Sequence, residues 1–275
     1  QTLPHSLEVL FEGMAQGSPL FCAEVAAFLQ NRPDLIRVQG LRVFHLADEE
    51  TLQREVSPAG LETALLERVD RLGTTLQLVL KGSAVLAQGQ TVGLALLQGV
   101  CDRVGKEGGG LSSATDDASK GEGIYPFLTE LLDQRLLVPS AAAEPSLSLC
   151  SGQLQRLVYA SVPALQRRQL HRAAAEEGLA SGIASIEMLA YHWAQAGDAA
   201  RALPYLLSAA ERADTCFAHR ERAHFYNEAL RVSMSDDADA PALAAVTSPG
   251  GRRLSASVPS WQLAQWHYEV GRSEW

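Results

Sequence analysis

Between residues 186 and 232 the apolar positions recur at the three- and four-residue spacing of amphipathic helices. One apolar stripe ends near Trp193, Gly197-Asp198 breaks the pattern, and a second stripe includes Leu206. A third helix follows, and it is expected to begin with Phe217 on its apolar face. Small alanines alternate with large aromatic residues along these stripes, so the helices can approach closely and stack. The pattern therefore predicts tetratricopeptide-like hairpins, which offer an interaction surface and contain no obvious chemistry.

The same spacing predicts a series of helices before residue 105. Their apolar stripes lie within 7–14, 18–29, 57–72, 74–86 and 91–100. Ser18-Pro19 and Ser57-Pro58 both have the form of a helix start, an N-cap residue followed by a proline in the first turn. Thr91 is expected to cap the last of these helices, with Val92 as its first apolar residue. A short strand-and-loop segment is expected over residues 34–50.

A different pattern follows, in which short apolar runs replace long stripes. A helix over 127–132 precedes two runs, 136–138 and 147–149, that have the length of short strands. Helix, strand, turn and strand after three helices form the outline of a winged helix. Further helical stripes follow over 154–158 and 165–174.

Two stretches carry too few apolar residues to bury a core, and both are expected to be flexible. The fold class predicted from all these patterns is mainly α: a helical bundle with a winged helix, followed by TPR-like (tetratricopeptide-like) hairpins. The expected divisions are a helical region that starts the winged helix (1–104), a flexible insertion (105–123), the rest of the winged-helix domain (124–180), TPR-like hairpins (181–232), a flexible linker (233–259) and the start of the next TPR-like helix (260–275).

Composition narrows the function classes. The chain has 275 residues, 47% hydrophobic and 20% charged, and a formal net charge of −9. This acidic balance repels phosphate backbones, so we expect no nucleic-acid partner. No apolar run reaches the ~20 residues of a membrane span. The four cysteines, Cys22, Cys101, Cys150 and Cys216, are scattered and favour a reducing, cytoplasmic compartment, where they are expected to be inert core residues.

No catalytic constellation is present in the sequence. It contains no G-x-x-x-x-G-K-[ST] phosphate loop, no H-E-x-x-H motif and no G-x-S-x-G elbow. His171 and His192 lie in buried-looking helices, so we interpret both as structural residues. The sequence therefore predicts no catalytic residue, no metal site and no cofactor within these 275 residues. We also expect the chain to be a piece of a longer protein.

Four segments nevertheless resemble one class of signalling ATPase. The sequence GSPLF at 17–21 resembles the G-N-P-L-F segment near the end of STAND-type ATPase modules. Residues 57–100 look like the helical region that follows in those modules, and 126–138 resemble part of their winged helix. The strongest similarity is that of LQRLVYASVPALQRRQLHRAAAEE, 154–177, to the segment R-x-x-x-Y-x-x-L-x-x-x-x-R-x-x-L-H that closes the winged helix.

This arrangement is similar to that of the soluble, bicarbonate-responsive adenylate cyclases and of large LuxR-type regulators, and we favour the cyclases. The resemblance implies a parent that converts ATP to cyclic AMP with Mg²⁺, and a segment here that regulates it through protein partners or other domains of the chain. A LuxR-like transcription regulator and a pure TPR scaffold are the alternatives. The resemblance also places Pro19 near the adenine of a bound nucleotide. Ser151 stands where the family often has a phosphate-contacting histidine, which puts nucleotide sensing in doubt.

Overall fold

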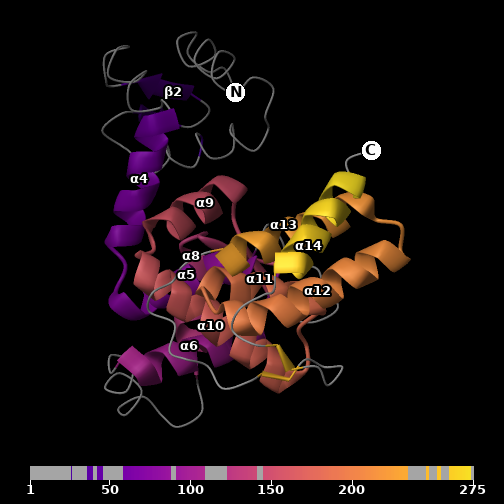
Figure 1. Ribbon diagram of the computed structural model, residues 1–275. Coiled ribbons are helices and arrows are strands. Elements are labelled where there is room, and N and C mark those ends of the chain that lie inside the picture. The colour runs from indigo at the N-terminus through magenta and orange to yellow at the C-terminus, as the bar shows by residue number, and fades with distance from the viewer. Residues whose placement is uncertain are drawn as a thin grey trace.

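The computed structural model describes residues 26, 36–39, 42–45, 58–87, 91–108, 123–140, 145–234, 246–247, 253–254 and 260–273. Within these residues the fold is mainly α, as the apolar spacing predicts (Figure 1). The first described element is an antiparallel pair of strands, β1 (Ile36–Gln39) and β2 (Arg42–His45), within the predicted strand-and-loop segment. The helices that follow are α4 (Pro58–Asp70), α5 (Thr74–Ala87), α6 (Leu94–Gly108), α8 (Tyr125–Asp133), α9 (Gly152–Ser161), α10 (Ala164–Ser181), α11 (Ile186–Ala196), α12 (Ala199–Thr215), α13 (His219–Met234) and α14 (Ser260–Ser273).

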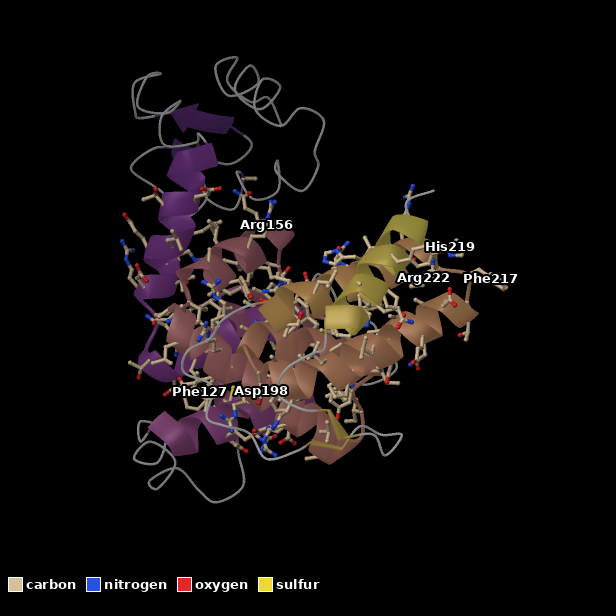
Figure 2. All side chains as sticks on the ribbon, viewed as in Figure 1. Phe127, Arg156, Asp198, Phe217, His219 and Arg222 are labelled. Carbon is tan, nitrogen blue, oxygen red and sulfur yellow. The ribbon has the colours of Figure 1, made fainter. Side chains whose placement is uncertain are left out.

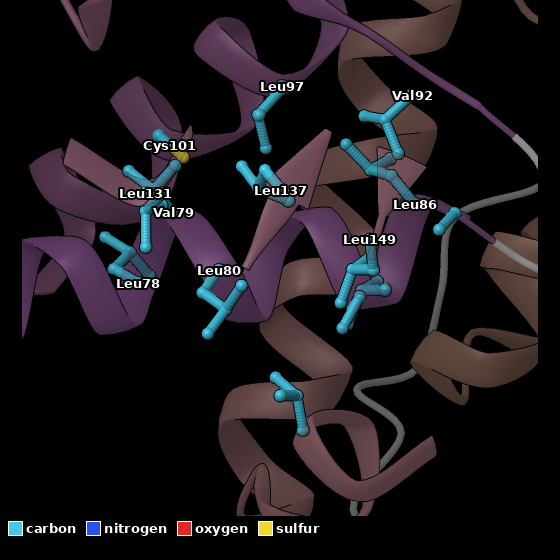
Figure 3. Packing of buried hydrophobic residues seen from close by; sticks show 14 of the residues in the cluster. Leu78, Val79, Leu80, Leu86, Val92, Leu97, Cys101, Leu131, Leu137 and Leu149 are labelled. Carbon is cyan, nitrogen blue, oxygen red and sulfur yellow. The ribbon is translucent and has the colours of Figure 1, made fainter. Parts of the chain in front are cut away.

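Helix α5 is the centre of the first hydrophobic core. From Leu78 to Ala87 nearly every side chain on it is buried, which is the property of a helix that is surrounded by other elements. Figure 3 shows its leucines and valines facing Leu97 of α6 and Leu131 of α8. Gly82 allows α6 to come close, since a Cβ there would lie 3.3 Å from Leu97 Cδ1. We call this cluster, which extends from Val69 to Ala174, the winged-helix core.

Three short strands complete the winged helix. The strands β3 (Val92–Gly93), β4 (Leu137–Pro139) and β5 (Ser146–Leu149) form an antiparallel sheet in the order β3-β5-β4. Val92 lies opposite Leu147, and Leu137 lies opposite Leu149, so the apolar residues of all three strands cover α5 and its neighbours. The chain order is therefore helix, strand, helix, helix, strand, strand, the order of a winged helix.

Two local expectations fail in this domain. Val92 belongs to β3 rather than to a helix capped by Thr91, and α6 begins at Leu94. A two-residue strand has too few positions to show a period of two, and its pairing with β5 comes from a segment more than 50 residues later. The predicted insertion at 105–123 also starts too early, because α6 continues to Gly108 while Val104 and Gly105 still pack against the core.

The C-terminal helices form successive hairpins joined by short turns. Ser185 caps α11 by accepting a hydrogen bond from Met188 N, and Asp198 caps α12 by accepting one from Arg201 N. Gly197 ends α11 with a φ of 79°, a left-handed conformation that suits glycine and permits the sharp reversal into α12. Each of α11, α12 and α13 packs against the next helix, and α14 packs on α13 (Figure 1). The predicted hairpins are thus present, and their apolar residues from Ala175 to Trp266 form what we call the hairpin core.

The turn between α12 and α13 differs from the prediction. Phe217 does not lie on the apolar face of α13, which begins two residues later at His219. Phe217 instead takes a left-handed φ of 57°, donates its backbone N–H to Asp214 O and leaves its side chain 80% exposed. Figure 2 shows it at the outer end of this turn. Arg222 on α13, only 2% exposed, forms an ion pair with Asp214 and so ties the turn to both helices.

Helix α10 belongs to both cores. Ala174 is part of the winged-helix core, and the next residue, Ala175, is part of the hairpin core. Figure 1 shows α10 between α6 and α11, the two helices that it contacts most. The change of core therefore falls inside a continuous helix and not at a flexible connection. Within the predicted linker at 233–259, two further strands, β6 (Val246–Thr247) and β7 (Arg253–Leu254), pair with each other.

Candidate functional site

The nucleotide-contacting residue that the resemblance implies cannot be placed. Pro19 lies outside the described residues, and so do the acidic pairs at 116–117 and 236–237 and the basophilic site at Ser255. Ser151, which stands where the family often has a histidine, is described. Its hydroxyl is 5% exposed and accepts a hydrogen bond of 3.1 Å from Leu154 N at the start of α9. This side chain serves as the N-cap of its own helix.

The main buried polar cluster that links the two cores contains two histidines. His171 on α10 and His192 on α11 are both 0% exposed, and their Nδ1 atoms lie 2.9 Å apart. On its other side, His171 Nε2 lies 3.0 Å from the hydroxyl of Tyr159 on α9. Tyr159 is in turn hydrogen-bonded to Tyr191 of α11. A continuous chain of polar groups therefore connects α9, α10 and α11.

Burial determines the charge state of this cluster. It lowers the pKa of His171 from an ordinary 6.5 to about 3, with further lowering by His192 and Arg167. Burial also lowers the pKa of His192 to about 4. Removal from water raises the pKa of Tyr191 to about 12, and its interactions with Tyr159 raise it further. At neutral pH the histidines and both tyrosines are therefore uncharged.

Aromatic and cationic groups enclose the pair. The ring of Tyr191 meets His171 edge-on at 5.5 Å, and the guanidinium carbon of Arg167 lies 4.7 Å from the ring centre of Tyr159. Arg167 also donates a hydrogen bond to Val162 O, which fixes it beside the start of α10. Such packing holds the rings in place but provides no room for a substrate between them.

The sequence correctly predicts that both histidines are buried, but their contact was missed. His171 lies 11 residues before Gly182, where α10 ends, and His192 lies 10 residues after it. Residues at equal distances from the turn of a helical hairpin face each other, so this symmetry was the available signal.

A second, ionic cluster also joins the two cores. Glu176 on α10 pairs with Arg103 of α6 at 3.5 Å and with Arg201 of α12 at 3.3 Å. The next residue, Glu177, accepts a 2.8 Å hydrogen bond from Arg103 Nε. Arg201 lies over the ring of Trp193 at 4.6 Å and so extends the contact into the hairpin core. These groups are half-buried and link three helices through one carboxylate.

The cysteines do not all behave as predicted. Cys101 is buried in the winged-helix core, and burial together with the neighbouring Asp102 raises the pKa of its thiol to about 12, so it is inert as expected. Cys150 is half-buried. Cys216 is exposed beside Phe217, which corrects its assignment to a core, because α12 ends before it and the turn carries it outward.

Neither cluster has the composition of a metal or catalytic centre. Among the described residues, no group of three or more His, Cys, Asp or Glu side chains is placed to hold a metal ion. No helix in the described part of the chain is long and apolar enough to cross a membrane. Comparisons with protein-family models, curated proteins and solved structures find no match to this chain.

Proposed function

We propose that this chain is a non-catalytic coupling segment of a STAND-type signalling protein. In this role the winged helix is held rigidly against helical hairpins that offer a surface to protein partners or to other domains of the same chain. The observation that carries the proposal is the sharing of α10: Ala174 and Ala175 are adjacent, yet they belong to different cores. A displacement of the winged helix must therefore move the hairpins as well.

The ionic cluster supports the same role. Glu176 is held between Arg103, on the winged-helix side, and Arg201, on the hairpin side. One carboxylate thus restrains α6 and α12 at once, although these helices are about 100 residues apart in the chain. Networks of this kind contribute more to a fixed arrangement than isolated surface pairs do.

The charge of α8 argues against the reading of nucleic acid by this winged helix. In a helix-turn-helix fold, a helix that enters a groove carries basic side chains for the phosphates. Helix α8 has the sequence YPFLTELLD, in which Glu130 and Asp133 are exposed and no residue is basic. This supports protein partners in place of a nucleic acid.

We further propose a soluble adenylate cyclase as the parent, and this part rests on the resemblance of 17–21, 57–100, 126–138 and 154–177. In such a parent, ATP is converted to cyclic AMP with Mg²⁺ by other domains. The complete protein is expected to form cyclic AMP in the presence of bicarbonate, whereas residues 1–275 alone are expected to show no ATP turnover. Absence of cyclase activity with Mg²⁺ and with Mn²⁺ would reject this parent, and a DNA-binding activity would favour the LuxR-like alternative.

The coupling itself is tested by unfolding residues 1–275 in urea with one probe in each core. All four tryptophans lie at or after Trp193, so tryptophan fluorescence reports the C-terminal part of the chain. Labelling of Cys101, measured by peptide mass spectrometry, reports the winged-helix core. Coupled cores are expected to unfold in a single transition at the same urea concentration.

Glu176→Gln is expected to separate the two transitions, because it weakens the link between α6 and α12. Glu187→Gln is the matched control, since Glu187 pairs with Arg212 inside the hairpins only. The control is expected to lower stability slightly without separating the transitions. Two well-separated transitions in the wild-type chain would contradict the coupling.

A further inference from the structure

We propose that the His171–His192 pair is a protonation-sensitive lock between α10 and α11, and that acidification releases α11 and the hairpins behind it from the winged-helix side. This inference rests on the coupling part of the proposed function and adds a way to regulate it. It does not depend on the identity of the parent.

The geometry of the pair requires neutral rings. Two neutral imidazoles can form one bond between their Nδ1 atoms, in which one ring donates and the other accepts. When both rings are protonated, two donors face each other at 2.9 Å and the bond is lost. A single proton on His171 still allows hydrogen bonds to His192 and to Tyr159, but it places a charge on a ring that is 0% exposed.

The surroundings of the pair do not compensate such a charge. Tyr159 from α9 and Tyr191 from α11 are neutral groups against the rings. Arg167, at the start of α10, is a cation that disfavours a second positive charge on His171. Glu228 from α13 acts on Tyr191 and so lies on the far side of that ring. The nearest formal charge that acts on His171 thus has the wrong sign for a proton.

The position of the pair makes its opening consequential. His171 and the hydroxyl of Tyr159 join α10 to α9 in the winged helix, whereas His192 and Tyr191 project from the first hairpin helix. Once the rings separate and meet water, each regains an ordinary pKa of 6.5, against about 3 and about 4 in the closed lock. Protons therefore bind the open form more strongly, and opening increases as the pH falls below 6.5.

The size of the effect follows from these values. Between pH 7.5 and pH 5.0, protonation of one exposed histidine multiplies the opening constant by about thirtyfold. If both histidines are free to protonate in the open form, the increase approaches about a thousandfold. Carboxylates titrate mainly below this range, so the histidines dominate it.

Hydrogen exchange of residues 1–275 at pH 7.5 and 5.0 tests the lock, with rates corrected for the intrinsic pH dependence of exchange. Amides of α11 and the second half of α10 are expected to lose between about thirtyfold and a thousandfold of their protection. Amides of α5, which is centred in the other core and contains no histidine, are expected to change far less. An equal loss in α5 and α11, or none in α11, would overturn the inference.

Variants assign the effect to the pair. His192→Asn keeps a hydrogen-bonding group near the Nδ1 position and is expected to reduce the pH effect to about thirtyfold. His219→Asn is the matched control, because His219 is exposed at the start of α13, and it is expected to keep the wild-type response. A wild-type response in His192→Asn would reject the assignment. If that variant does not fold, imidazole ¹⁵N spectra of the wild type decide instead: the lock requires neutral His171 and His192 in the folded chain at pH 5.0.

The outcomes also separate the lock from the coupling. Rapid exchange throughout α10 and α11 already at pH 7.5 would contradict the coupling of the two cores. Strong protection of both helices at pH 7.5 and at pH 5.0 would contradict the lock alone.

Discussion

Ala174 and Ala175 are neighbours in α10, and both are 0% exposed, but they face two different hydrophobic cores. Successive residues of an α-helix point about 100° apart, so one helix can offer separate sides to two layers. Alanine is suited to both positions because its small side chain lets α6 and α11 come close to the same helix. The two halves of the described structure are joined through these contacts.

Gly99 is expected to be required for the approach of α6 to α10. A Cβ at this position would lie 2.7 Å from Glu177 Oε1 and closer still to other atoms of that side chain. Gly99→Ala must therefore displace Glu177 from its 2.8 Å bond with Arg103. We expect the free energy of unfolding in urea to fall by about 1 kcal/mol, although alanine favours a helix.

Gly152→Ala is the matched control for Gly99→Ala. Gly152 is also in a helix, and an added Cβ would meet nothing within 4 Å. This substitution is expected to be neutral or to stabilise the protein by up to about 1 kcal/mol. Equal effects of the two substitutions would show that the close approach at Gly99 does not matter.

The buried histidines predict that stability falls with acidification. Their pKa values are below the ordinary 6.5 in the folded protein, so below pH 6.5 the unfolded chain binds more protons. Their contribution is complete above pH 6.5 and is lost as the pH falls toward about 3 to 4, at about 1.4 kcal/mol per pH unit for each histidine. Urea unfolding between pH 7.5 and 5.0 measures this slope, and a flat profile would contradict it.

Phe217→Gly is expected to stabilise the protein. A left-handed φ of 57° is unfavourable for phenylalanine, and the ring is 80% exposed, so its removal sacrifices little packing. Relief of the strain, less the added entropy of glycine in the unfolded chain, leaves a gain of roughly 0.5–1 kcal/mol. Phe217→Ala keeps the Cβ and should give no such gain in thermal unfolding. A loss of stability with glycine would mean that the ring has a packing role.

Thiol labelling is expected to distinguish Cys216 from Cys101. Cys216 is exposed and should react with iodoacetamide at pH 8, as followed by peptide mass spectrometry. Cys101 is buried, and the pKa of its thiol is raised to about 12, so its reaction should await unfolding. Labelling of Cys101 in native buffer at the rate of Cys216 would show that the winged-helix core opens readily.

Long, strongly periodic segments were predictable from the sequence, and isolated or long-range features were not. The stripes of α5, α11 and α12 predict their helices because burial on one face repeats over three or more turns. The strand β3 was missed because its two residues depend on a partner far along the chain. Phe217 was assigned to a helix because an aromatic residue near an apolar stripe has the same local pattern whether it is buried or in a turn.

The candidate site shows the same division. That His171 and His192 are buried follows from their apolar neighbours, but their contact depends on the turn that pairs α10 with α11. The role of Glu176 was missed for a similar reason, since Arg103 and Arg201 lie 73 residues before it and 25 residues after it. The spacing of charges along one helix does not indicate pairs between different helices.

Helix α10 has a mechanical consequence that follows from its length. Its 18 residues, Ala164–Ser181, form a rod of about 27 Å. A tilt of this rod by about 10° around its N-terminal end would move its C-terminal end by about 5 Å, roughly one helical turn. Since α11 follows after a short turn, the hairpins would be carried along with that end. The helix can thus act as a lever, in which a small rotation at the winged helix becomes a large shift of the surface that α11 to α14 present.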